Sequence, residues 1–369
     1  MTDHVVVANE VLRALRAGTP IVALETAVVT HGLPRATMDD LRRAPTGDPT
    51  SRATALPRSF GDDDAWNQAS PINLELARLL ERVVRAGGAT PATMAVIDGQ
   101  LRIGLDEAAL ARLACDERAV KASARDLAAA MVHRRSAGLT VAGALRACDA
   151  VAAIEGDGAR GDRGAAVPAP SIRVLATGGI GGAHRGWNHG ADISADLFAL
   201  ARSPVCVVCS GAKSILDLPA TLEMLDSLGV AVIGFRTSAL PRFTSRSGDG
   251  PRLPQRLDDA AEIARLCDLH WRVARNPGAV VVMQEPPEAH AIDPGAAERA
   301  TIEAERRAAE RGVRGAELTP FLLGEIAALT NGRSLSANIA LLEANARLAA
   351  WIASCAPRAS ADTTRVHRA

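Results

Sequence analysis

The chain has 369 residues, 48% of them hydrophobic, and it carries 42 basic and 42 acidic side chains. Such a chain can build a sizeable core in one large domain or two smaller ones. Its balanced charge offers no basic excess for nucleic acid, so an anionic ligand needs a local site. Six cysteines do not make a disulfide scaffold at this length, the apolar run 21–29 is too short to span a bilayer, and Asp3 and His4 break any signal sequence, so we expect a cytoplasmic protein.

Short apolar strands alternate with amphipathic helices, a pattern typical of an α/β protein with a central mixed β-sheet flanked by helices. The pair Asp98-Gly99 between two apolar runs predicts a hairpin, and Asp258 or Asp259 is placed to cap a helix. In chain order we expect strands at 21–24, 93–97, 101–103, 173–176, 205–209, 230–235 and 279–283, and helices at 73–86, 222–228, 260–274, 296–311, 320–329 and 336–353.

Two segments break this alternation. Residues 35–70 mix Pro, Asp, Arg and Thr without a period, and residues 156–171 are rich in Gly, Ala and Asp. Both compositions are typical of surface insertions or flexible loops. We therefore predict one domain over residues 1–358 that carries these two insertions, followed by a disordered tail at 359–369.

Lysine is rare in this sequence: Lys121 and Lys213 are the only two, and arginine supplies the other basic side chains. A nucleotide bias that exchanges surface lysine for arginine would explain this at little cost. Under such a bias a lysine persists where arginine cannot serve, and arginine cannot form an imine because it stays protonated. Persistence by chance is the alternative.

Two charged residues stand at the ends of apolar strands. Glu25 follows the run 21–24, where partial burial would raise the pKa of its carboxyl group and suit a proton donor. Lys213 follows the run 205–209 through three small residues, at the strand end where α/β proteins usually bind ligands, and could act as a nucleophile. The ordinary alternatives are a solvated or arginine-paired Glu25 and a solvated Lys213.

The segment after the strand 173–176 is rich in glycine. Gly178-Gly-Ile-Gly-Gly182 could present backbone amides to an anion, and His184 and Arg185 add positive charge beside it. A plain turn is the alternative.

Asp192 and Asp196 are four residues apart at the start of a predicted helix and would share one helical face. Oxygen ligands of this kind suit Mg²⁺ or Mn²⁺ held mainly through water. Asp192 or Ser194 could instead cap the helix.

Cys206 and Cys209 have the spacing of a redox pair, but they lie in an apolar strand in which residues three apart face opposite sides. We expect buried structural cysteines.

Taken together, these segments resemble the pseudouridine-5′-phosphate glycosidase family, which includes indigoidine synthase A-like proteins. The resemblance follows the same order along most of the chain, and this order makes it specific where no single motif would. The matching motifs are ALET (23–26), THGLP (30–34), GATPATM (88–94), KASARD (121–126), ATGGIGGAHRG (176–186), DISADL (192–197), VCSGAKSILD (208–217), TPFLL (319–323) and SLSAN (334–338).

The resemblance implies an enzyme that reversibly cleaves the carbon–carbon bond of pseudouridine 5′-phosphate to uracil and ribose 5-phosphate through a lysine imine. It implies that Lys213 is the nucleophile, that Glu25 is the proton donor, and that Asp192 is linked to a metal, typically one Mn²⁺ per subunit. The family precedent is a homotrimer. The substrate contacts implied by the resemblance are Lys121, Val141, Ser194, Ala195 and Asp196.

Three positions depart from the family pattern. Ala124 stands where the family has the first of two arginines, Leu139 begins a run that is usually Thr-Thr-Val, and Gln284-Glu285 replaces an Asn-Pro pair. These departures bear on substrate identity more than on reaction class. Another Schiff-base lyase on a phosphosugar and a non-catalytic phosphosugar-binding homologue are therefore the alternative functions.

Overall fold

The computed structural model describes residues 4–37, 40, 67, 69–158, 171–248 and 250–356. Most of the predicted insertion at 35–70, residues 159–170 of the second insertion and the predicted tail at 359–369 lie outside the described residues. Arg35, the first residue of the predicted 35–70 insertion, is part of the folded domain, because its guanidinium donates to the backbone oxygens of Thr30 at 2.9 Å and Asp116 at 3.1 Å.

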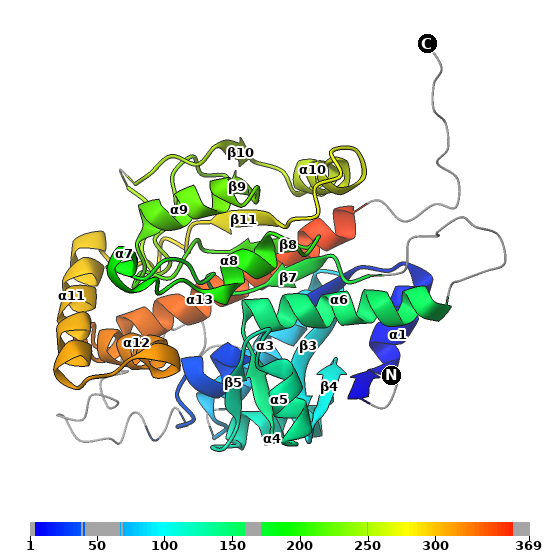
Figure 1. Cartoon of the computed structure of the whole chain (residues 1–369), viewed down its shortest axis with the longest axis horizontal. Helices are drawn as coiled ribbons and strands as arrows, with labels where there is room; N and C mark the ends of the chain where they lie inside the picture. Colours follow the sequence, from blue (N-terminus) through cyan, green and yellow to red (C-terminus); the bar gives the residue numbers. More distant parts are fainter. Residues whose placement is uncertain are drawn as a thin grey trace, which may run out of the picture.

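One mixed sheet runs through the described residues in the order β1-β4-β3-β2-β7-β8-β11-β9-β10, with β6 beside β3 and β5 beside β6 (Figure 1). All neighbours from β3 to β10 on this path are parallel, whereas β4 and β6 run antiparallel to β3. This confirms the predicted fold class. The strands are β1 (Val5–Val7), β2 (Ile21–Leu24), β3 (Thr90–Ile97), β4 (Gln100–Ile103), β5 (Val120–Ala122), β6 (Ala137–Leu139), β7 (Val174–Ala176), β8 (Cys206–Cys209), β9 (Ala231–Phe235), β10 (Gln255–Leu257) and β11 (Val280–Gln284).

Local signals in the sequence are confirmed at two places. Asp98 and Gly99 join β3 to β4 with φ values of 52° and 80°, the left-handed conformation that a two-residue hairpin of this kind needs. The side chain of Asp259 caps the helix that follows it, accepting from the amides of Ala261 and Glu262.

Helices cover both faces of the sheet, because strand side chains alternate between the two. Ile21 and Ala23 pack in one apolar cluster with α1 and α6, whereas Val22 and Leu24 pack in another with α3, α10 and α13. The helices are α1 (Asn9–Ala17), α3 (Ile72–Ala86), α4 (Glu107–Cys115), α5 (Leu127–Val132), α6 (Val141–Gly158), α7 (Trp187–Gly190), α8 (Ala195–Leu200), α9 (Leu218–Ser227), α10 (Ala260–Arg272), α11 (Pro294–Glu310), α12 (Leu318–Leu329) and α13 (Arg333–Cys355), with a π-helical turn at Val28–Gly32 and a 3₁₀ turn at Gly315–Glu317.

The two cysteines of β8 separate onto these two faces. Cys206 lies in the cluster with α13, and Cys209 lies in the cluster with α6. Both thiols are buried, and burial raises the pKa of the Cys209 thiol to about 12. The prediction of structural cysteines facing opposite sides is therefore confirmed.

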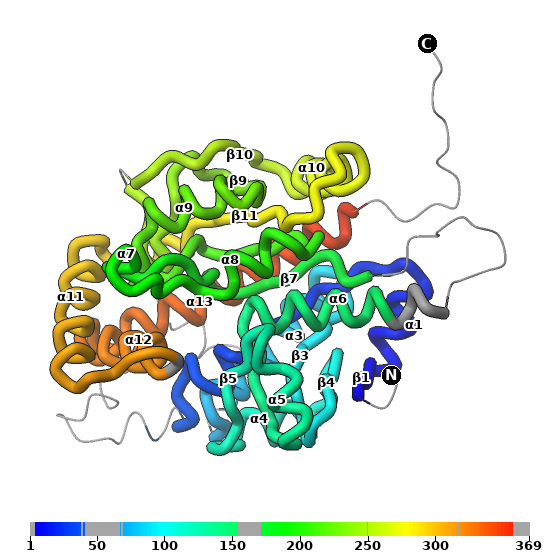
Figure 2. Tube along the Cα trace, in the orientation of Figure 1, coloured from blue at the N-terminus to red at the C-terminus, as the bar shows by residue number. Residues whose placement is uncertain are grey.

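The long helix α13 runs beneath the centre of the sheet, from α12 at one end to α10 at the other, and contacts β2, β7 and β8 on the way (Figure 2). Sixteen of its residues are buried, including two asparagines, Asn338 and Asn345. It therefore brings amide side chains to the middle of the sheet.

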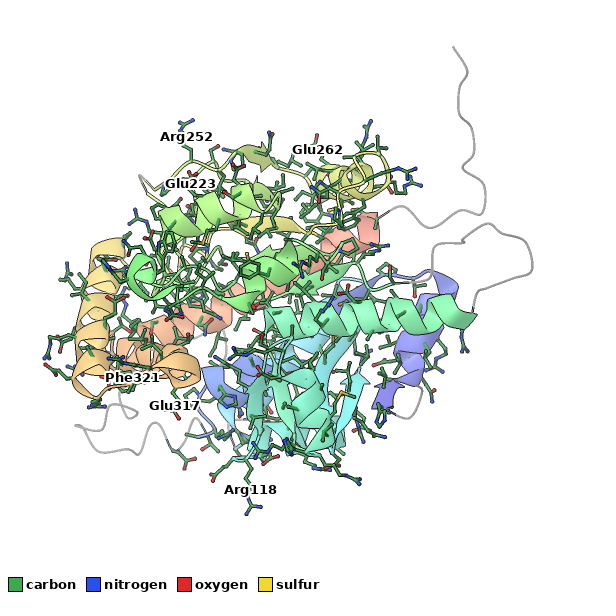
Figure 3. The ribbon with its side chains drawn as sticks, in the orientation of Figure 1. Arg118, Glu223, Arg252, Glu262, Glu317 and Phe321 are labelled. Atoms are coloured by element: carbon green, nitrogen blue, oxygen red, sulfur yellow. The ribbon has the colours of Figure 1, made fainter. Side chains whose placement is uncertain are left out.

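The molecular surface is charged. Arg118, Glu223 and Glu262 point outward from opposite ends of the molecule (Figure 3), and all three are exposed. Within the part of the chain that the structure describes, no helix is long and apolar enough to cross a membrane.

Candidate active site

The candidate site lies at the carboxyl ends of neighbouring parallel strands. Glu25 follows β2, Thr177 follows β7, and Lys213 comes four residues after β8. Since β2, β7 and β8 are adjacent and parallel, their carboxyl ends meet at one edge of the sheet. Thr177 Oγ1 donates to Glu25 Oε1 at 3.2 Å, and the amide of Val28 donates to Glu25 Oε2 at 3.4 Å.

The environment of Glu25 favours its protonated form. Burial raises the pKa of its carboxyl group, and the positive charge of Lys213 and the two hydrogen bonds only partly oppose this effect. The raised pKa agrees with the prediction for a strand-end carboxyl. It allows Glu25 to hold a proton closer to neutral pH than an exposed glutamate can.

Lys121 belongs to the same site although it comes from a different part of the sheet. It lies on β5, and burial lowers the pKa of its ammonium group, followed by repulsion from Lys213, while Asp196 and Glu25 act in the opposite direction. The two lysines, Glu25 and Asp196 therefore interact electrostatically with one another. Four segments that are far apart in the sequence meet here.

Asp196 is a buried carboxylate whose hydrogen bonds come from the backbone. It is 5% exposed, and its oxygens accept from the amides of Ala142 at 2.9 Å and Gly181 at 2.8 Å. Ala142 follows Val141, the first residue of α6, which is 2% exposed. Asp196 thus ties the start of α6 to the glycine segment.

The predicted pairing of Asp192 and Asp196 on one helical face is wrong. Helix α8 begins at Ala195, and Ser194 is its cap, with its hydroxyl accepting from the amide of Asp196 at 3.2 Å. Asp192 precedes the helix in an extended segment in which Ile193 bridges Ala183. It is exposed, whereas Asp196 is buried, because the chain turns between them.

The glycine segment 178–182 packs closely against its neighbours, and backbone amides in and beside it donate hydrogen bonds to other groups of the protein. The amide of Ile180 donates to Gly211 O, that of Gly181 to Asp196, and that of Ala183 to Thr221 Oγ1. A Cβ at Gly181 would lie 2.6 Å from Ser194 Cβ. Glycine is needed for close approach here, and these three amides do not form the predicted anion cradle.

Arg185 also differs from its predicted role. Its guanidinium donates to both oxygens of Glu298 at 2.7 and 2.9 Å and lies 3.5 Å from Glu305. Its charge is neutralised by α11. Arg185 is therefore a link between the glycine segment and α11.

Two histidines lie close to the lysines, and neither was expected to have a catalytic role. Burial lowers the pKa of His31 and of His184, and repulsion from Lys121 lowers both further. His31 sits in the π-helical turn, six residues after Glu25, where its Nδ1 lies 2.7 Å from Thr30 Oγ1. The signal that could have identified His31 is its place in the strand-end motif THGLP.

A cavity of about 160 Å³ opens beside the nucleophile candidate, because Ser214, the neighbour of Lys213, lines it. His31 and Asn338 supply polar groups to its wall, and Phe243 and Leu335 supply apolar surface. A small pocket with convergent polar groups beside a lysine can support imine chemistry, and the carboxyl group of Glu25, with its raised pKa, can support acid–base chemistry in the same site.

The residues near Asp192 do not form a closed metal cage, and one exposed carboxylate, that of Asp192, is available to a cation. Among the described residues, no group of three or more His, Cys, Asp or Glu side chains gathers to hold a metal. Asp192 has an exposed carboxylate, and it acts electrostatically on His184. Mn²⁺ or Mg²⁺ can be bound through one carboxylate when water fills the remaining positions.

Comparison with known proteins places this chain in a family. The family model described as "Indigoidine synthase A like protein" matches residues 68–156 and 165–355. The chain belongs to this family. The family members that resemble it include a pseudouridine-5′-phosphate glycosidase of Sorangium cellulosum, 42% identical over 352 residues that cover 95% of this chain and 93% of the relative. A protein of the same name from Myxococcus xanthus is 41% identical and covers 95% of this chain and 98% of its own.

Solved structures in the family have the same fold. The prealnumycin C-glycosynthase AlnA, crystallised in complex with ribulose 5-phosphate, superposes with a TM-score of 0.73 at 30% identity and covers 96% of this chain and 97% of its own. An indigoidine synthase A-like protein from Thermotoga maritima gives a TM-score of 0.71 at 29% identity, covering 95% of this chain and 96% of its own. The indigoidine synthase A-like fold therefore extends over nearly the whole chain.

Proposed function

We propose that this chain reversibly cleaves pseudouridine 5′-phosphate to uracil and ribose 5-phosphate through an imine on Lys213. The observation that carries the proposal is the gathering of three residues into one partly desolvated site: Glu25 and Lys213, which follow strands β2 and β8, and Lys121, which lies within β5. The names of the full-length relatives supply the substrate class.

The bond to be broken joins two carbons, so protonating a leaving heteroatom cannot break it. Lys213 Nζ would bond to ribose C1′ as the C1′–O4′ bond opens and O4′ takes up a proton. Glu25 would then deliver a proton to uracil C5. The C1′–C5 electron pair stays with uracil while the nitrogen lone pair forms the C=N bond, and water finally releases ribose 5-phosphate from Lys213.

The other predicted residues would bind the substrate. An anionic phosphate beside Lys121 would favour its charged form and so offset the lowering of its pKa by burial. Ser194, Ala195 and Asp196 at the start of α8, with Val141 at the start of α6, would contact the sugar.

Asp192 would hold one Mn²⁺ per subunit, mainly through water, and the ion would supply positive charge that orients the sugar or the base. We further propose that the protein acts in the cytoplasm as a homotrimer, following the family precedent.

Incubating the chain with pseudouridine 5′-phosphate and Mn²⁺, and following uracil by chromatography, tests the proposal. We expect uracil from the unmodified protein and none from Lys213→Arg, which keeps the charge and cannot form the imine. Release of uracil by both proteins would contradict the role of Lys213, and release by neither would contradict the substrate.

Action on a phosphosugar other than pseudouridine 5′-phosphate is a second candidate function, because a structural neighbour is a C-glycosynthase bound to ribulose 5-phosphate. In this chain Gln284 replaces the family asparagine, and its Nε2 donates to Asn345 at 2.7 Å. A lyase acting on another phosphosugar would still form an adduct on Lys213 under borohydride but would not need uracil. A non-catalytic homologue would bind ribose 5-phosphate without forming any adduct.

A further inference from the structure

Asn345 is a buried amide that joins three strand ends. It lies on α13 and is 0% exposed. Its Nδ2 donates to the backbone oxygen of Thr177 at 2.8 Å, after β7, and lies 3.3 Å from Ser210 Oγ, after β8. Its Oδ1 accepts from Gln284 Nε2, at the end of β11, at 2.7 Å. One side chain thus holds the ends of β7, β8 and β11 together.

Two of these strand ends lead directly to the proposed reacting groups. The hydroxyl of Thr177 donates to Glu25 Oε1 at 3.2 Å, so the residue whose carbonyl Asn345 holds is also the one that holds the carboxyl group. Ser210 begins the short connection to Lys213, and its amide donates to Gly178 O at 2.9 Å. The distance between Glu25 and Lys213 therefore depends on how these strand ends are held together.

The placement on α13 distinguishes Asn345 from the other buried asparagine of that helix. Asn338 lines the cavity next to Lys213. Asn345 lies seven residues further along, about two helical turns, outside the lining of that cavity, and its side chain bonds to Thr177, Gly178, Ser210 and Gln284. A direct contact with substrate is not needed to explain Asn345.

We infer that Asn345 is a positioning residue: through Thr177 it fixes the carboxyl group of Glu25 relative to the strand end that carries Lys213. This inference rests on the proposed function, because it assumes that Glu25 and Lys213 act together. Asn345 does not line the cavity next to Lys213.

Loss of the Asn345 side chain should change the pH dependence of catalysis. The charged groups that act on Glu25 are Lys213, Asp196 and, from β5, Lys121. The hydroxyl of Thr177 donates to Glu25 and so favours the ionised carboxylate. If Thr177 moves away, that stabilisation is lost and Glu25 keeps its proton to higher pH. A general acid works only while protonated, so the alkaline limb of kcat should then move to higher pH.

The test compares Asn345→Ala, Thr177→Val and the double variant. We expect Asn345→Ala to lower kcat by about 10- to 100-fold, because small misplacements of reacting groups have large effects on rate. KM should change by less than about threefold, because Asn345 is 0% exposed and does not line the cavity next to Lys213. The alkaline limb of kcat should move to higher pH, and the double variant should show the pH profile of Thr177→Val alone.

Leu348→Ala is the matched control for stability. Leu348 lies on the same helix, is 4% exposed and packs in the cluster with Val22, and its apolar side chain takes no part in the hydrogen bonds of Asn345. It should lower stability without moving the pH profile. If Asn345→Ala behaves like Leu348→Ala, or if its effect simply adds to that of Thr177→Val, the positioning role is refuted.

Trapping with ribose 5-phosphate and borohydride separates this inference from the proposed function. If the unmodified protein releases no uracil, the proposed substrate is wrong. The yield of the borohydride-trapped adduct on Lys213 still tests the role of Asn345. Asn345→Ala should lower this yield, and Leu348→Ala should not. Equal trapping in all three proteins would overturn the inference.

Discussion

Replacing Gly181 with alanine tests whether the start of α8 contacts the substrate. A Cβ at Gly181 would lie 2.6 Å from Ser194 Cβ and 2.9 Å from Asp196 Oδ2, and it would overlap Ser194 Oγ. Non-bonded carbon atoms prefer a separation of about 3.5–4.0 Å. Ser194 and Asp196 must therefore move, or the glycine segment must move away from them.

The effect on stability should be moderate. Inserting a methyl group into a well-packed core typically costs about 1–3 kcal/mol, and we expect the free energy of unfolding to fall by about that amount. The effect on turnover should be larger. A shift of about 1 Å in a substrate-binding group can lower kcat/KM by about 100-fold, so denaturation and uracil release should be measured on the same preparations.

Gly182→Ala provides a matched control on the adjacent residue. Its Cβ would lie 2.5 Å from Thr221 Cγ2 and 2.9 Å from Thr221 Cβ, a comparable overlap directed at α9 and not at Ser194. Gly190→Ala serves as a baseline, because a Cβ there meets no atom within 4 Å. If Gly181→Ala and Gly182→Ala lose stability and turnover to the same extent, Ser194 and Asp196 have no special role toward the substrate.

Three further predictions concern the reacting groups. Borohydride with ribose 5-phosphate should add one sugar to the peptide that contains Lys213, and an adduct on Lys121 instead would reverse the two roles. After chelation, Mn²⁺ should restore activity to the unmodified protein and not to a folded Asp192→Ala variant; full activity of the chelated enzyme would refute the metal role. Burial raises the pKa of Glu25 above its value in the unfolded chain, so the folded state binds the proton more tightly. The free energy of unfolding should therefore fall as pH rises between those two values, and denaturation series should show a flatter slope for Glu25→Gln if this carboxyl is the cause.

Much of the fold could be predicted from local patterns. The apolar runs of β2 and β8 are continuous because both faces of a parallel strand are covered by helices. The predicted strands and helices are present, with bounds that differ by a few residues. The short strands β1, β5, β6 and β10 were missed, because three residues carry too little pattern and these strands are defined by their partners.

The candidate site was predictable in its residue types more than in its geometry. Glu25 and Lys213 could be recognised because a charged residue after an apolar strand stands out against its neighbours. The prediction for Asp192 was wrong because it assumed that the helix begins at Asp192. Helix α8 begins three residues later, at Ala195, so helical spacing does not apply to Asp192. The glycine run had two structural explanations, and local sequence could not distinguish an exposed anion cradle from close packing against Ser194 and Thr221.

The amino-acid sequence by itself determined the alternation of strands and helices, the Asp98-Gly99 hairpin, a helix cap at Asp258 or Asp259, and the restriction of lysine chemistry to two positions. These depend on residues within a few positions of one another. Only the tertiary structure decided that Lys121 shares a site with Lys213, that Asp196 bonds to Ala142, and that Asn345 joins the ends of β7, β8 and β11. The physical reason is that burial and hydrogen bonding depend on groups brought together by the sheet order, and Asn345 and Thr177 are 168 residues apart in the chain.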